Sequence, residues 1–302
     1  MRATRVLLPL ATLLALSGSV ASAQTRTLAL VSGTIYTDPA AAPLRDGVVL
    51  IRDGTIAAVG TRGAVQVPNG ADTIDCSGLT ITAGLWNSHV HFTERKWANA
   101  ARIDAPELAS QLQAMLTRYG FTSVFDTGSM WENTKRIRDR IESGEVAGPR
   151  IRSTGEILEP PGGVPPDLVL DITGAMHVKL PEVASATDAR EAARALLDAG
   201  VDGIKLYAQT WAPPIVVMPP DAVRGAVEAG MNGRDILASL TTAPAGRFGA
   251  ASRAGRVAAG LDADIVVLAG DPAADVRAFA AVRYSIRGGR VIYSAPPPLR
   301  AR

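Results

Sequence analysis

The chain has 302 residues, of which 47% are hydrophobic and 5% aromatic, and its formal net charge is +2. This composition is that of a chain that folds around a core, and the length suits one large domain or two smaller ones. Both surplus positive charges, Arg2 and Arg5, lie at the very start, so the remaining chain is neutral and offers no basic surface for nucleic acid.

Residues 1–23 have the pattern of a secretory signal peptide. Two arginines precede a short apolar run, Val6–Leu16, and Ala21-Ser22-Ala23 forms a small-x-small cleavage site. The alternative is a membrane anchor, but the apolar run is shorter than the roughly 20 residues that a bilayer requires. We therefore expect a mature chain that begins at Gln24, is periplasmic or secreted, and has no membrane segment.

Both ends of the mature chain have strand patterns separated by tight turns. Arg52-Asp53-Gly54-Thr55 predicts a two-residue hairpin, because Asp-Gly tolerates the positive φ angles of a type I′ turn. Near the other end, the apolar strand Asp264–Leu268 is followed by a second hairpin pattern, Arg287-Gly288-Gly289-Arg290. We expect residues 24–79 and 256–295 to form one small β-sandwich domain built from both chain ends, with 296–302 as a tail.

Cys76 is the only cysteine, so no disulfide can form within the chain. A cysteine nucleophile needs a basic partner, and no histidine lies near Cys76 in the sequence. The sequence favours a small buried apolar residue at this position.

Residues 80–255 alternate between strand and helix patterns. The first strand ends at Val90, and a helix with Asp104 as its N-cap follows and ends at Gly120. Later strand patterns cover Thr122–Phe125, Arg150–Thr154 and Asp202–Tyr207, and later helix patterns cover Trp131–Ile141 and Asp188–Ala199. Four strands joined by helices predict a parallel α/β sheet or barrel.

His89 and His91 alternate at the end of the first of these strands. Because side chains on a strand repeat every second residue, both imidazoles lie on one face and could grip one metal ion. The alternative is two histidines that are merely packed or solvated.

Lys205 lies within the apolar stretch Gly203–Tyr207. An inward-pointing lysine needs a partner, since burying an unpaired ammonium is costly. The alternative is a side chain that reaches solvent at the strand end.

Several stretches, in chain order, resemble the amidohydrolase superfamily and its imidazolonepropionase-like members. They are Thr82–His91, Leu158–Pro165, Gly203–Lys205, Ala238–Ala245 and Gly260–Leu268. The resemblance covers nearly all of residues 27–293 and implies a TIM (β/α) barrel beside the small β domain.

The resemblance also implies the site and its chemistry. His89 and His91 would bind the more buried of two divalent metal ions, most often zinc in this family. Lys205, carbamylated by CO₂, would bridge the two metals. The implied reaction is hydrolysis of a carbon–nitrogen bond in a small amide-like substrate by a metal-activated water.

Part of the family's ligand set is absent from this sequence. The family has a histidine after the fifth strand, another after the sixth and an aspartate after the eighth, whereas this chain has three histidines in total. The third, His177, lies upstream of Lys205 in the loop between the third strand and its helix, so by position it can be neither missing ligand. It is a weak candidate for substrate contact, as is Tyr207. No catalytic residue is assigned. Asn87 replaces the family's aspartate, and Asp126 is interpreted as structural.

The spacing predicts an internal deletion. Only 35 residues separate Lys205 from Thr241, whereas a full barrel takes about 250 residues, or roughly 30 for each strand-helix unit. Strands five to eight are therefore missing, and the join lies within Pro219–Gly233. The expected fold is an incomplete barrel, residues 80–255, with the β-sandwich domain beside it.

Three functions remain open from the sequence. The first is a metal-dependent amidohydrolase acting on a small amide, cyclic imide-like ring or dipeptide. The second is an inactive remnant of such an enzyme, because two or three ligands predict weak metal binding and little turnover. The third is a homo-oligomer of half-barrels with a binding role, since exposed sheet edges and apolar surface favour self-association.

Overall fold

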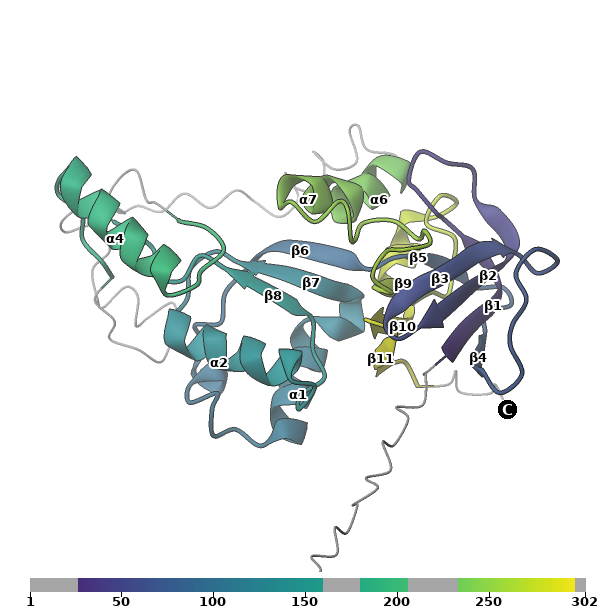
Figure 1. The fold of residues 1–302 in the computed structure, drawn as a ribbon, viewed down its shortest axis with the longest axis horizontal. Coiled ribbons are helices and arrows are strands. Elements are labelled where there is room, and N and C mark those ends of the chain that lie inside the picture. Colours follow the sequence, from purple (N-terminus) through teal and green to yellow (C-terminus); the bar gives the residue numbers. More distant parts are fainter. Residues whose placement is uncertain (1–26, 160–179, 206–232, 297–302) are drawn as a thin grey trace, which may run out of the picture.

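The computed structural model describes residues 27–159, 180–205 and 233–296 (Figure 1). Several sequence expectations lie wholly or almost wholly outside these ranges: the signal peptide, the loop after Glu159, His177, Tyr207, the deletion join and the carboxyl-terminal tail.

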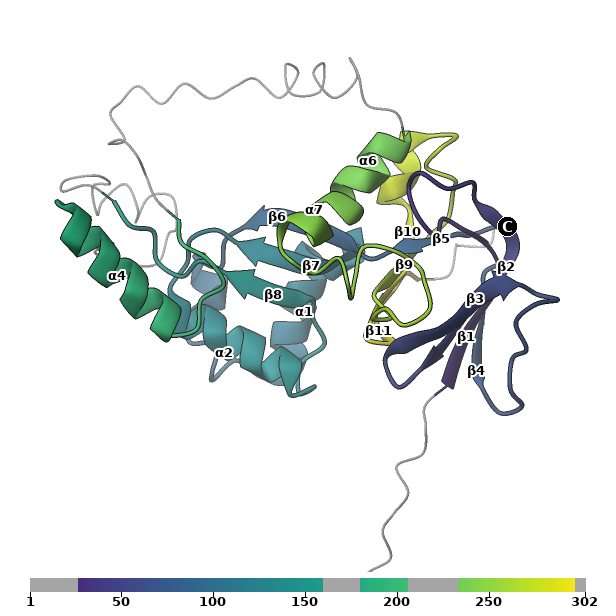
Figure 2. The same ribbon diagram turned by 45° about the horizontal axis from the view of Figure 1, so that its top comes forward.

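A large sheet of eight strands occupies one end of the molecule (Figures 1 and 2). Its order is β11-β10-β9-β5-β1-β2-β3, and β4 pairs with β1. The strands are β1 (Thr27–Ile35), β2 (Leu44–Arg52), β3 (Thr55–Thr61), β4 (Asp72–Asp75), β5 (Thr80–Ala83), β9 (Ile265–Leu268), β10 (Val282–Arg287) and β11 (Arg290–Ser294). The antiparallel pairing of β5 with β9 joins the two chain ends, and it brings Thr80–Ala83, which the sequence assigned to the barrel, into the large sheet. All eight strands belong to one hydrogen-bonded sheet, so the expected sandwich of two sheets is not confirmed.

Both predicted hairpin turns are confirmed. Asp53 and Gly54 have φ angles of 48° and 83°, and Gly288 and Gly289 have 51° and 71°, which is the positive-φ pair that a type I′ turn requires. The turns also meet: a side chain at Gly54 would lie 3.0 Å from the carbonyl oxygen of Gly288.

The core of the large sheet draws side chains from both chain ends. Its fully buried members include Leu30, Ile56, Ile81, Ile265 and Ile286. Burial of a branched aliphatic side chain contributes about 1.5–3 kcal/mol, so this shared core holds the two chain ends together.

Cys76 belongs to the same core and is fully buried, as predicted. Burial, with a smaller effect from the neighbouring Asp75 carboxylate, raises the pKa of its thiol to about 12.

Cys76 should therefore resist thiol reagents in the folded protein. At pH 8, a pKa near 12 leaves on the order of one thiolate in ten thousand, and the reagent also has no access. We expect labelling by a chromogenic disulfide at pH 8 to be complete in denaturant and negligible without it. Rapid labelling of the folded chain would show that this core is open.

A second sheet contains three parallel strands in the order β6-β7-β8. They are β6 (Leu85–Val90), β7 (Phe121–Asp126) and β8 (Arg150–Ser153), and they match the first three strands expected from the sequence. The connecting helices α1 (Ala105–Met115) and α2 (Trp131–Glu142) cover one face (Figure 1). Short 3₁₀ segments occur at η1 (Arg95–Trp97), η2 (Thr117–Tyr119) and η3 (Val276–Ala280).

The helix ends follow the sequence in most details. Gly120 and Gly144 take positive φ angles, 82° and 79°, just beyond η2 and α2. Asp104 occupies the N-cap of α1, but its side chain makes no capping hydrogen bond. Helix α4 (Ala186–Asp198) is capped by Ser185, whose hydroxyl accepts a hydrogen bond from the Asp188 amide at 3.1 Å.

The predicted fourth strand is wrong over residues 202–205, which have no regular strand structure. The segment still runs beside the chain that follows β8: Asp202 N–H donates to the Ser153 carbonyl at 2.7 Å, and Leu158 N–H donates to the Lys205 carbonyl at 3.0 Å. Between these contacts, Gly155 has a φ angle of 65°. This left-handed residue breaks the extended backbone that a continuous ladder needs.

Phe248 covers the opposite face of the small sheet. Its ring stacks on Trp86 and Phe125, with centroid distances of 5.7 and 4.7 Å, and its carbonyl accepts a hydrogen bond from Arg152 at 2.6 Å. Phe248 directly follows α7 (Thr242–Arg247), which with α6 (Gly233–Leu240) lies beside β6 (Figures 1 and 2). Within the described ranges the parallel sheet has three strands. The expected incomplete barrel is therefore not confirmed. No helix in these ranges is long and apolar enough to cross a membrane.

Gly84 lies where the chain leaves the large sheet for the small one. β5 ends one residue before it and β6 begins one residue after it. Its N–H donates to the Asp264 carbonyl at 2.8 Å, and a Cβ atom at this position would overlap the side chain of Thr122. Only glycine allows the backbone so close to β7.

Gly84→Ala should therefore destabilise the protein by about 1–3 kcal/mol, the usual cost of forcing an extra carbon into a packed site. Chemical denaturation would measure this loss. Gly63→Ala is the matched control, because a Cβ there meets nothing within 4 Å. Equal stability of the two variants would contradict the close approach at Gly84.

Candidate metal site

His89 and His91 come together at the carboxyl end of β6. Their Nε2 atoms lie 3.2 Å apart, and their ring planes are inclined by 68°. Both side chains are exposed to solvent. The strand alternation therefore brings the two imidazoles together, as the sequence predicts.

The spacing of the two nitrogens suits one shared cation. Two nitrogens bound tetrahedrally to zinc at about 2.0–2.1 Å lie roughly 3.3 Å from each other. The observed 3.2 Å between the Nε2 atoms matches that value. Both nitrogens could therefore meet one ion without backbone movement once the proton of their mutual hydrogen bond is displaced.

A backbone carbonyl determines the tautomer of His91. Its Nδ1 lies 2.7 Å from the carbonyl oxygen of Gly128. Because a carbonyl only accepts, Nδ1 carries a proton, and in the neutral ring Nε2 then keeps a lone pair that can accept a hydrogen bond from His89 Nε2. Metal-bound histidines usually make such a bond through their second nitrogen.

The surroundings of His89 favour its neutral form. Burial lowers its pKa, and the charges of His91 and Lys205 lower it further. Only a neutral imidazole can bind a metal. The His89 N–H donates to Asn87 Oδ1 at 3.2 Å, so asparagine supports the local turn where the family has aspartate.

Asp126 ends β7 and is completely buried. Its Oδ1 accepts hydrogen bonds from the Ser129 hydroxyl at 2.6 Å and the Gly128 amide at 3.2 Å. Its Oδ2 accepts from the Ser153 hydroxyl at 2.8 Å and the Thr134 hydroxyl at 3.3 Å. Burial raises the pKa of Asp126 above its usual value, and the hydrogen bonds from Ser129, Ser153 and Gly128 and the nearby His91 offset this only in part. The carboxyl is enclosed by protein groups, in agreement with its interpretation as structural.

The sequence did not reveal three supporting residues. Gly128, Ser129 and Ser153 hold either His91 or Asp126, yet none has a residue type or spacing that indicates this role. The contribution of Gly128 is a backbone carbonyl, which leaves no signature in a sequence.

The described residues do not complete a family-type metal site. They contain no cluster of three or more histidine, cysteine, aspartate or glutamate side chains able to hold a metal. The residues gathered here are therefore His89, His91 and, by its electrostatic effect, Lys205. His177 and Tyr207 lie outside the described ranges, so their candidacy stays a prediction.

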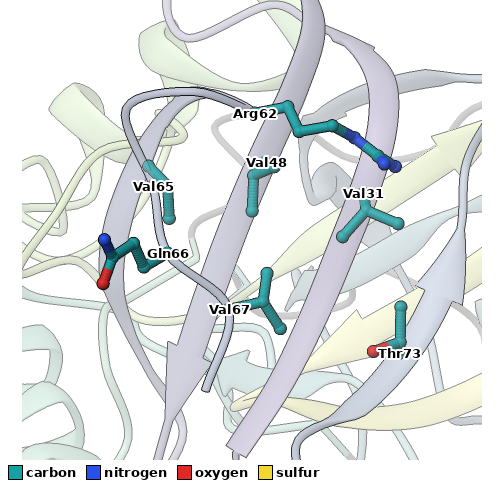
Figure 3. A pocket seen from close by; sticks show the side chains of 7 residues that line it. All are labelled: Val31, Val48, Arg62, Val65, Gln66, Val67 and Thr73. Atoms are coloured by element: carbon teal, nitrogen blue, oxygen red, sulfur yellow. The ribbon is translucent and has the colours of Figure 1, made fainter. Parts of the chain in front are cut away.

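Two surface hollows lie away from the histidines. One, of about 510 Å³, is on the large sheet and is lined by four valines, Arg62, Gln66 and Thr73 (Figure 3). The other, of about 310 Å³, lies between the two hairpin turns and the end of α2. Neither includes His89 or His91, so neither is a substrate pocket for this site.

Comparisons with known proteins support the fold. No protein-family model and no curated protein sequence matches the chain. Among solved structures, it is similar to an Xaa-Pro dipeptidase with methionine bound in its active site, at a TM-score of 0.70 and 17% identity, covering 89% of this chain and 100% of the other. It is also similar to molinate hydrolase, at 0.67 and 18%, covering 92% and 99%, and to ochratoxinase of A. niger, at 0.59 and 17%, covering 90% and 96%.

Proposed function

We propose that this chain, whose fold is that of amidohydrolase-superfamily structures, is a metal-dependent hydrolase of carbon–nitrogen bonds. One observation carries the proposal: the two Nε2 atoms of His89 and His91 lie 3.2 Å apart, and a carbonyl favours the neutral tautomer of the second ring in which Nε2 has a lone pair.

Each residue has a defined part in this proposal. His89 and His91 would hold a divalent cation, for which zinc is the first candidate because imidazole is among its preferred ligands. Lys205, carbamylated by CO₂, would add oxygen ligands next to His89. When bound, a divalent cation supplies Lewis acidity, which polarises a carbonyl oxygen and lowers the pKa of water.

The proposed substrate is a small amide, a cyclic imide-like ring or a dipeptide. The dipeptide class is supported by the similarity to the Xaa-Pro dipeptidase. The proposal includes export of the chain, with the signal peptide of residues 1–23 removed before Gln24.

A second candidate function is a catalytically inactive relative that retains one weak cation site. The observation that favours it is the ligand set: no third histidine, cysteine or carboxylate joins His89 and His91 in the described parts of the chain. Catalytic zinc sites normally have three protein ligands.

Titration calorimetry with Zn²⁺ on metal-stripped protein tests the cation site. We expect the wild-type chain to bind Zn²⁺, and at least about tenfold weaker binding for His89→Ala and for His91→Ala, since each removes a ligand or its orientation. His177→Ala, which alters the chain's third histidine, is the matched control and should bind like the wild type.

The same preparation separates the two candidates. Two ions per chain together with release of amino acids from a dipeptide panel would establish the hydrolase. One weakly bound ion without turnover would establish the inactive relative. Binding that survives both alanine substitutions would contradict the site itself.

A further inference from the structure

We propose that Asp126 is a positioning residue for His91: through the turn formed by residues 127–129, its buried carboxylate holds the His91 ring in the orientation and tautomer that present Nε2 to a cation. The role in cation binding rests on the proposed function, whereas the effect of Asp126 on the His91 ring can be tested without metal.

The first step is the bond between the carboxylate and the turn. Oδ1 of Asp126 accepts from both the Gly128 amide and the Ser129 hydroxyl. A buried carboxyl group is stable only when its polar atoms are hydrogen-bonded, and both groups that bond Oδ1 belong to the turn. The turn is therefore fixed relative to the end of β7.

The second step is the contact between the turn and the histidine segment. Thr127 N–H donates to the Val90 carbonyl at 3.0 Å, Gly128 accepts from the His91 ring at 2.7 Å, and the Ser129 hydroxyl accepts from the Phe92 amide at 2.7 Å. The residue before His91, its ring and the residue after it are all bonded to these three residues.

Ser129 makes the connection most directly. Its single hydroxyl donates to Asp126 and accepts from Phe92. Gly128 is confined as well, because a Cβ at this position would overlap Ile157. The carbonyl that bonds His91 thus has little freedom to move while the carboxylate stays in place.

The other oxygen of Asp126 supplies an internal control. Oδ2 accepts from Ser153 on β8 and from Thr134 on α2. The Thr134 bond is the longer of the two, at 3.3 Å, and it involves the oxygen that does not bond the turn. Removing it perturbs the same buried carboxylate but leaves every bond between the turn and His91.

The tautomer of a neutral histidine is determined by the bond that its other nitrogen makes. If Asp126 no longer holds the turn, the Gly128 carbonyl can shift and the proton can occupy Nε2. A protonated Nε2 has no lone pair for a cation, so weakened binding should accompany the change of tautomer.

Asp126→Asn tests this chain of contacts by replacing one carboxyl oxygen with an amide group at nearly constant shape. We expect ¹⁵N spectra of the metal-free, ¹⁵N-histidine-labelled protein to show His91 protonated at Nδ1 in the wild type and as a mixture in the variant. Zn²⁺ affinity by calorimetry should fall about 10–100-fold, the usual range for a residue that orients a ligand.

Ser129→Ala should change both readouts in the same direction, and it tests the inference if Asp126→Asn does not fold. Thr134→Val should leave the His91 tautomer unchanged and the Zn²⁺ affinity within about twofold of the wild type. Thermal unfolding monitors the fold of each variant.

The inference would be overturned by folded Asp126→Asn or Ser129→Ala protein whose His91 stays protonated at Nδ1. It would also be overturned if Thr134→Val altered the tautomer as strongly, since that would indicate general loosening of the core. If the wild type binds no Zn²⁺, the proposed function fails, whereas the tautomer spectra still decide the role of Asp126.

Discussion

A buried carboxylate connects the strand ends on which the candidate site depends. Asp126 ends β7, reaches the segment beyond β6 through Ser129 and Phe92, and reaches the end of β8 through Ser153. A carboxyl group this deeply buried is tolerated only with its hydrogen bonds made, so the three strand ends are fixed as one unit. Strand alternation brings the two imidazoles together, and this arrangement fixes the orientation of the His91 ring.

The large sheet determines where β6 begins. Its strands from both chain ends meet at the β5–β9 pair, and one residue later the chain enters the small sheet at Gly84, whose amide is bonded to Asp264. Leu85, the first residue of β6, packs against Val266 and Val282 of the large sheet. The small parallel sheet is therefore attached to a core that contains residues from both ends of the chain.

Local features of the sequence predicted local structure well. The Asp53-Gly54 turn and the convergence of His89 with His91 follow from backbone preference and strand alternation alone, and both are observed. The features that could not be predicted depend on distant contacts. Whether eight strands form one sheet or two is decided by long-range pairing. The absence of strand structure at 202–205 accompanies the left-handed Gly155 that faces this segment. The bond that orients the His91 ring comes from the backbone of Gly128.

Anomalous diffraction from crystals of the protein grown with zinc tests the central claim most directly, because it locates the ion without any assumption about activity. The account predicts a zinc peak about 2.0–2.1 Å from the Nε2 atoms of both His89 and His91, with the His91 Nδ1 still bonded to the Gly128 carbonyl. A structure with full zinc occupancy at other residues and none between these two imidazoles would contradict it.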